Sequence, residues 1–168
     1  MLNSWFKHTS LRFVILLLLI LGNAGCDQIS KRLVRDKVDA YAQIEVVRDR
    51  LMLTNVENTG AFLSLGAEWS GTWKNLFLAI IPAIVLSYML FLVLFSRNLS
   101  TALSVGLAFI TGGGIGNIYD RIRYGSVTDF LHLDFHFFET GIFNLADLSI
   151  TFGTVIVLLS FITARHKS

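Results

Sequence analysis

Two aspartates, Asp129 and Asp147, stand where polar sequence meets long apolar sequence. The apolar runs cover residues 102–110 before this stretch and 148–162 after it. An acid at the middle of a bilayer costs on the order of 3 kcal/mol, so membrane segments rarely keep acids that have no use. We therefore take Asp129 and Asp147 as the candidate working pair, brought together at a membrane surface.

Two carboxylates that meet at such a site can do acid and base chemistry together. Their repulsion and partial desolvation raise the pKa of one of them, so the pair shares a single proton. The ionised acid can then take a proton from an attacking water while the protonated acid polarises an amide carbonyl. This chemistry needs neither a metal nor a covalent intermediate, and the membrane would restrict it to peptides held at the bilayer surface.

Polar residues next to this pair have both a structural and a functional interpretation. Asn117, Asp120 and Arg121 share one face of a helix, at positions i, i+3 and i+4. Asp120 with Arg121 would form a structural charge pair at the helix end, which would still anchor the loop that follows. Asn144 has the position of an N-cap, and the acid three residues later the position of a first-turn acid.

Two further polar clusters lie earlier in the chain. Asp27 and Lys31 are four residues apart in the favourable acid-first order, which is typical of a surface ion pair but also of a functional one. Asn58 and Gly60 precede an apolar tip. They indicate either a turn, since both residue types tolerate positive φ, or an amide that is offered to a bound backbone.

A metal site is a weaker interpretation of the histidines. His132, Asp134 and His136 alternate and would share one face of a strand. No further ligand follows in the sequence, so a solvated polar face is preferred and we expect no metal and no cofactor. Gly112 and Gly116 do not fit a phosphate-binding loop, and their spacing is typical of close helix packing in membranes.

The elements that must position these residues are membrane helices. Hydrophobic residues make up 54% of the 168-residue chain and the mean hydropathy is +0.63, which is more than a soluble domain needs. We predict a single membrane domain over residues 1–168, a mostly α fold with four transmembrane helices and a small extracytoplasmic β-sheet with a lid loop. The helices are expected at about 11–29, 76–95, 99–118 and 143–164, the strands at 43–47 and 51–56, and the extracytoplasmic segments at 31–74 and 120–142.

Charge and cysteine content exclude some classes of function. The net charge of +2 is too small to suggest a nucleic-acid partner, and one cysteine, Cys26, excludes an internal disulfide framework. Residues 23–26 are similar to the site at which lipoproteins are lipidated and cut. Three later apolar segments argue against a processed lipoprotein and for a retained first helix. Counting basic residues does not orient the four helices.

Four blocks of the sequence resemble a known family, the lipoprotein signal peptidases or signal peptidase II, which are aspartic endopeptidases of bacterial membranes. The blocks occur in the family's order and reach from the end of the first helix to the start of the fourth. They are Asp27-Gln28-Ile29-Ser30-Lys31, Asn58-Thr59-Gly60-Ala61-Phe62, residues 113–121 with Val127-Thr128-Asp129-Phe130, and Phe143-Asn144-Leu145-Ala146-Asp147. The polar insert at 131–142 matches no motif of the family.

The resemblance implies an activity and assigns roles. Asp129 and Asp147 would be the catalytic dyad of a hydrolase that removes the signal peptide from diacylglyceryl-modified prolipoproteins, cutting before the lipidated cysteine. The residues expected to support the site or contact substrate are Asp27, Lys31, Asn58, Gly60, Asn117, Asp120, Arg121 and Asn144. Expected partners are these prolipoproteins, membrane lipids and the inhibitor globomycin. We expect a monomer in the bacterial inner membrane, with cytoplasmic termini and an extracytoplasmic site.

A different class of function is also open to this sequence. A small proton-coupled transporter or channel subunit would use Asp120, Asp129 and Asp147 as a proton relay. A relay should place its acids through the depth of the membrane. Here the acids gather at segment ends on one side, which favours chemistry at the interface.

Overall fold

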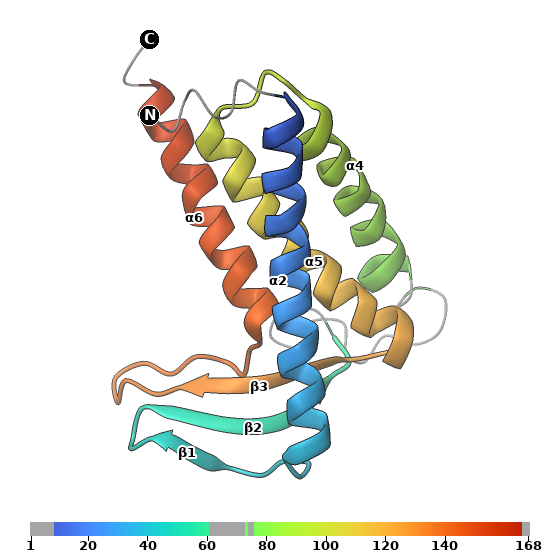
Figure 1. The fold of residues 1–168 in the computed structure, drawn as a ribbon. Helices are drawn as coiled ribbons and strands as arrows, with labels where there is room; N and C mark the ends of the chain where they lie inside the picture. The colour runs from blue at the N-terminus through green and yellow to red at the C-terminus, as the bar shows by residue number, and fades with distance from the viewer. Residues whose placement is uncertain (1–8, 61–72, 74–75, 166–168) are drawn as a thin grey trace.

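Four long helices stand side by side, and a small sheet lies across one end of them (Figure 1). The structure is a computed structural model that describes residues 9–60, 73 and 76–165. The helices are α2 (Thr9–Lys37), α4 (Ile81–Phe95), α5 (Thr101–Tyr124) and α6 (Leu145–Arg165), and a π-helical turn, η2 (Leu76–Ile80), leads into α4. Four helical segments are long and apolar enough to cross a membrane. The predicted mostly α class with four membrane-type helices is therefore confirmed, while the lid loop and the extracytoplasmic side of the sheet stay predictions.

Two helices continue well past the ends of their apolar sequence. α2 has 29 residues and is thus about 43 Å long, more than the ~30 Å of hydrocarbon requires. The expected end at residue 29 marks only the end of the apolar composition, since residues 30–37 are mostly good helix formers. α5 likewise continues past residue 118 and ends at Gly125, whose φ of 77° gives the left-handed cap that glycine adopts without strain. These extensions carry polar side chains from the membrane to the sheet.

The helix α5 is the centre of the bundle and packs against α2, α4 and α6. Small residues make this possible, as their spacing predicts. Gly112 faces Ile20 of α2, and Gly116 contacts the carboxylate of Asp27 on the same helix. On another face Gly113 lies against the backbone of α6, where an added Cβ would be 2.5 Å from the carbonyl oxygen of Ala146.

We expect Gly113→Ala to lower the free energy of unfolding by about 1–3 kcal/mol, because the methyl group would press on backbone that cannot move aside. Chemical unfolding of the purified protein in mixed micelles measures this difference. Gly22→Ala is the matched control, because a Cβ at exposed Gly22 would meet nothing within 4 Å. The control should be neutral or slightly stabilising. Equal stability of the two variants would contradict the close approach of α5 and α6.

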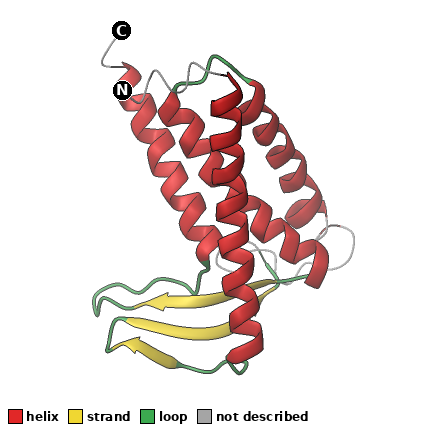
Figure 2. Ribbon diagram, viewed as in Figure 1, coloured by secondary structure: helices red, strands yellow, loops and turns green. Residues whose placement is uncertain are grey.

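The sheet is antiparallel in the order β1 (Ile44–Val47), β2 (Leu51–Asn58) and β3 (Val127–Leu133) (Figure 2). The first two strands confirm the strands predicted at 43–47 and 51–56. In the register of β2 and β3, Asp129 lies opposite Val56. The backbone N–H and C=O of Leu131 both bond to Phe143, which ties the segment before α6 to the free edge of β3. The sheet thereby brings Asp129 to the first turn of α6.

The predicted alternation of residues 129–138 stops early. β3 ends at Leu133, and His136 has a φ of 65° in a tight turn where its N–H donates to the side chain of Asp134. His132, Asp134 and His136 therefore do not share one strand face, and that expectation was wrong. The cause is the Asx turn, in which a side chain replaces the next strand hydrogen bond. The apolar tip predicted after Gly60 lies outside the described residues.

Candidate active site

A cavity of about 900 Å³ opens where the sheet meets α5 and α6. Asp129 and Asp147 both line it, although one lies on a strand and the other on a helix. The apolar part of its lining is Phe138, Ile142 and Phe143 together with Leu148, Ile150 and Val155 of α6. The remaining polar residues of its lining are Asn58, Asn117, Arg121 and Asn144, together with Glu139 and three threonines.

Asn144 joins the two carboxylates. Its side-chain Nδ2 donates to Oδ1 of Asp129 at 2.6 Å, and its backbone N–H donates to Oδ2 of Asp147 at 3.2 Å. In return its Oδ1 accepts from the backbone N–H of Asp147 at 3.0 Å. This reciprocal pair is a capping box with Asn144 as N-cap of α6. The predicted N-cap is therefore present, and the same residue also connects the two carboxylates; its role in a working site stays a prediction.

Asp129 is the more enclosed of the two acids, with 4% of its surface exposed. Burial is the main reason that its pKa is raised to about 6, and the negative charge of Asp147 raises the pKa further. Hydrogen bonds from Asn58 and Asn144 and the charge of Lys31 oppose that shift. At neutral pH this carboxyl group is therefore close to its titration point, as a group that must hold and release a proton requires.

The turn at Asn58 orients one of the donors to Asp129. Oδ1 of Asn58 accepts from the backbone N–H of Gly60 at 3.0 Å, so its Nδ2 points at Oδ2 of Asp129, 2.9 Å away. The carbonyl of Gly60 in turn accepts from Arg121 at 3.0 Å. The turn interpretation of this motif therefore agrees with the structure, while an amide offered to a bound backbone stays a prediction.

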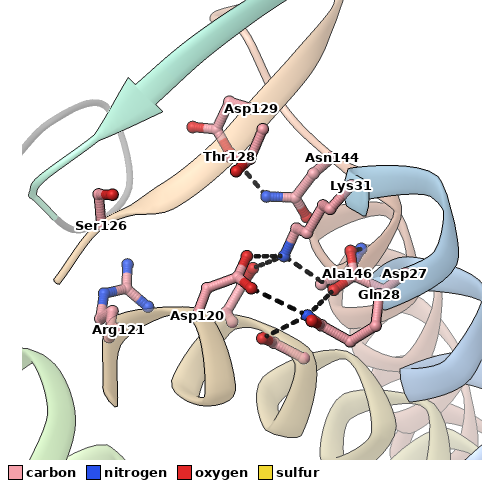
Figure 3. Close-up of polar contacts among 12 residues, drawn as sticks. Asp27, Gln28, Lys31, Asp120, Arg121, Ser126, Thr128, Asp129, Asn144 and Ala146 are labelled. Atoms are coloured by element: carbon pink, nitrogen blue, oxygen red, sulfur yellow. Dashed lines mark hydrogen bonds and ion pairs between the residues drawn. The ribbon is translucent and has the colours of Figure 1, made fainter. Parts of the chain in front are cut away.

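Lys31 is completely buried, so the surface ion pair considered for Asp27 and Lys31 was wrong. The ammonium lies 2.8 Å from Asp27 and 3.0 Å from Asp120, and it donates to Oδ1 of Asn117 at 2.9 Å (Figure 3). Asp27 also accepts the backbone N–H of Ala146 at 2.9 Å, next to Asp147. The buried cluster thus connects α2, α5 and the start of α6.

Asp120 and Arg121 do not form the charge pair that was expected. Asp120 turns to Lys31, and Arg121 points the other way, toward Gly60 and the cavity (Figure 3). Neighbouring residues on a helix face different directions, which explains the separation. Arg121 lines the cavity with the candidate pair, whereas Asp120 is connected to Asp147 through Lys31 and Asn117.

Other supporting residues were not predicted. Gln28 donates to the carboxylate of Asp120 at 3.1 Å, and Arg35 donates to Oγ1 of Thr128 at 2.7 Å. Thr128 in turn donates to Glu57 at 2.7 Å, which holds β3 in place one residue before Asp129. The available signal was helical spacing, because Arg35 lies four residues after Lys31. It required knowing that α2 continues that far.

No metal-binding group of three His, Cys, Asp or Glu side chains occurs in the part of the chain that the structure describes. His132 lies 3.7 Å from Glu139, and His136 is held in the turn described above. The polar residues at the cavity form direct hydrogen bonds to each other instead.

Comparison with known proteins places this arrangement among bacterial membrane peptidases. The sequence model of the family "Signal peptidase (SPase) II" matches residues 13–163. A lipoprotein signal peptidase of Pseudomonas fluorescens is 32% identical over 97% of this chain and 94% of its own length. One from Pelodictyon phaeoclathratiforme is 36% identical over 88% and 87%. A solved bacterial membrane enzyme, 23% identical, has the same fold with a TM-score of 0.81 over 92% of this chain and 91% of its own.

Proposed function

Because the chain belongs to the signal peptidase II family, we propose that it is an aspartic endopeptidase with Asp129 and Asp147 as its catalytic pair. The family removes signal peptides from lipoproteins, so the chain is a peptidase and a multi-pass protein of the bacterial inner membrane. The finer proposal is that it cuts diacylglyceryl-modified prolipoproteins immediately before the lipidated cysteine.

One observation carries this proposal: a single asparagine, Asn144, hydrogen-bonds to both carboxylates. Two acids that bond to one residue, Asp129 to its side chain and Asp147 to its backbone N–H, lie in position to share one proton and to hold one water molecule between them. Their cavity also has room for a peptide. A proton relay across the bilayer has less support, because the acids Asp27, Asp120, Asp129 and Asp147 gather at the sheet end of the helices.

In the proposed mechanism one carboxyl group is ionised and the other is protonated. The ionised group takes a proton from a water molecule as the water oxygen attacks the scissile carbonyl carbon, and the protonated group gives its proton to the carbonyl oxygen. The groups then exchange roles. The first gives its proton to the leaving amine nitrogen as the C–N bond breaks, and the second regains a proton as the new carboxyl carbonyl forms.

The surroundings of the pair fit a substrate that stays attached to the membrane. The lining of the cavity continues along α6 through Leu148, Ile150 and Val155, inside the segment Leu145–Thr163 that is long and apolar enough to span a membrane. Acyl chains on the substrate could remain in lipid along this lining while the peptide reaches the acids. We place the sheet and the cavity on the extracytoplasmic side and both termini in the cytoplasm, where exported precursors would meet the site as a monomeric enzyme.

The test is to incubate the purified enzyme with a diacylated prolipoprotein and with its unlipidated form. We expect the lipidated form to be cut before its cysteine and the unlipidated form to be cut at least ~10-fold more slowly, because remote binding energy positions the reacting bond. Globomycin should block cleavage and EDTA should not. Loss of activity in EDTA would contradict a pair of acids acting without metal, and equal cleavage of both substrates would contradict recognition of the lipid.

A further inference from the structure

The amide of Asn117 is fixed in direction by a charge. Its Oδ1 accepts from the ammonium of Lys31 at 2.9 Å, and its Nδ2 donates to Oδ1 of Asp147 at 2.9 Å. An ammonium can only donate hydrogen bonds, so it must face the oxygen of the amide. The N–H group of the same amide therefore has to face Asp147. A reversed amide would place its NH₂ group against Lys31, inside a fully buried cluster.

The two acids differ in which groups orient the amides that donate hydrogen bonds to them. The amides that donate to Asp129 are oriented by neutral backbone N–H groups, at Gly60 and at Asp147. The amide that donates to Asp147 is oriented by the full charge of Lys31. Asp147 also lies in the first turn of α6, where the helix N-terminus favours an anion. Asp129 lies on a strand and has no such support.

Lys31 acts on Asp147 mainly by orienting the amide of Asn117, and less by adding net positive charge. The buried cluster contains two cations, Lys31 and Arg35, and two carboxylates, Asp27 and Asp120, so its formal charges cancel. The other charged groups near Asp147 are Arg121 on α5 and Asp129 on β3. What Lys31 contributes beyond this balance is the orientation of one amide.

We propose that Lys31 is a positioning residue that, through Asn117, fixes Asp147 as the carboxylate that takes the proton from the attacking water and leaves Asp129 as the acid. This inference rests on the proposed function and assigns the two roles that the mechanism above left open. Asp147 accepts the proton of the water, and Asp129 gives its proton to the carbonyl oxygen. In the second half Asp147 passes its proton to the leaving nitrogen, and Asp129 regains one.

A double-mutant cycle with Lys31→Met and Asn117→Leu tests the connection. Each variant should lower kcat about 10–100-fold with little change in KM, because the base is no longer held in place. The double variant should be no slower than the slower single variant, since both remove the same contact. Losses that multiply would overturn the proposal, because they would show that Lys31 acts independently of Asn117.

Two companion variants separate positioning from folding. Lys31→Met leaves buried acids unpaired, so the cycle is repeated with Asp27→Asn present, which keeps the formal charges of the cluster balanced. Gln28→Met is the comparison inside the same cluster, because Gln28 donates to Asp27, to Asp120 and to the carbonyl of Gly116, and not to the amide that faces Asp147. Any loss of kcat in Gln28→Met should multiply with Asn117→Leu. If Gln28→Met is instead as non-additive as Lys31→Met, the cluster acts only as scaffold and the proposal fails.

The proton itself can be located by infrared spectroscopy of protein with ¹³C-labelled aspartate carboxyls. The spectra are recorded at a pH below 6, the approximate pKa of Asp129. The band of a protonated carboxyl should be absent in Asp129→Asn and present in Asp147→Asn. The opposite result would overturn the assignment of roles. Full activity of Asp147→Asn would instead contradict the proposed function, so the two failures are distinguishable.

Discussion

Replacing Asp129 or Asp147 by asparagine is expected to lower kcat/KM at least ~10³-fold. General acid or base catalysis by one group contributes about 10²–10⁴-fold, and an amide can do neither step. Both acids face one cavity and one asparagine, so the loss of either leaves the other without the partner that shares its proton. Cleavage of a diacylated prolipoprotein by each purified variant measures the effect.

The variants should remain folded, which makes the loss of activity interpretable. Asp129→Asn removes a buried charge, which is favourable, but it places an NH₂ group against one of the two amide N–H donors, which is unfavourable. Because these effects oppose each other, the stability of the variant at pH 8 should be close to that of the wild type. Asp147→Asn weakens the capping box and should cost about 1 kcal/mol. Unfolding in mixed micelles checks both values.

Asp36→Asn is the matched control for this substitution. Its side chain is 59% exposed and pairs only loosely, at 3.7 Å, with exposed Arg32. An exposed pair of this kind contributes little, so activity and stability should both be unchanged. Turnover within a few-fold of wild type by Asp129→Asn or Asp147→Asn would exclude that residue from the catalytic pair.

The sequence predicts the fold well because membrane segments have a strong compositional signal. About 20 predominantly apolar residues are needed to cross the hydrocarbon layer. Each of the four helices is long enough and apolar enough in composition to do so. The first two strands were also visible, on either side of the turn at 48–50. The positions of Asp129 and Asp147 at segment ends were sufficient to suggest that they meet, although their catalytic role stays a prediction.

The partners of the buried residues could not be predicted from local spacing. Asp27 and Lys31 have the spacing of an exposed ion pair, and only the glycines of α5 let that helix approach closely enough to enclose them. Asp120 bonds to Lys31, 89 positions earlier in the chain, in place of its neighbour Arg121. Such pairings depend on how the helices pack, and the neighbouring residues in the sequence do not predict that packing.

The activity of the enzyme should fall as the pH rises above about 6. Burial raises the pKa of Asp129 from 3.8 to about 6, so below that pH Asp129 would keep the proton that the proposed mechanism requires. Above it Asp129 loses that proton in the free enzyme, and kcat/KM should drop about tenfold per pH unit, or about 100-fold by pH 8. Because these profiles report the pair, the apparent pKa belongs to both acids.

The same raised pKa has a consequence for stability with a definite sign. The folded protein holds the proton of Asp129 more tightly than the unfolded chain does, so the free energy of unfolding should fall as the pH rises from about 4 to about 6 and then level off. The total change from this one group is at most about 3 kcal/mol. It should vanish in Asp129→Asn and persist in the control Asp36→Asn.

A kcat/KM that stays constant from pH 5 to pH 8 would mean that the pair does not lose its proton over this range. Bound substrate excludes further water from Asp129, so kcat should decline at a higher pH than kcat/KM does.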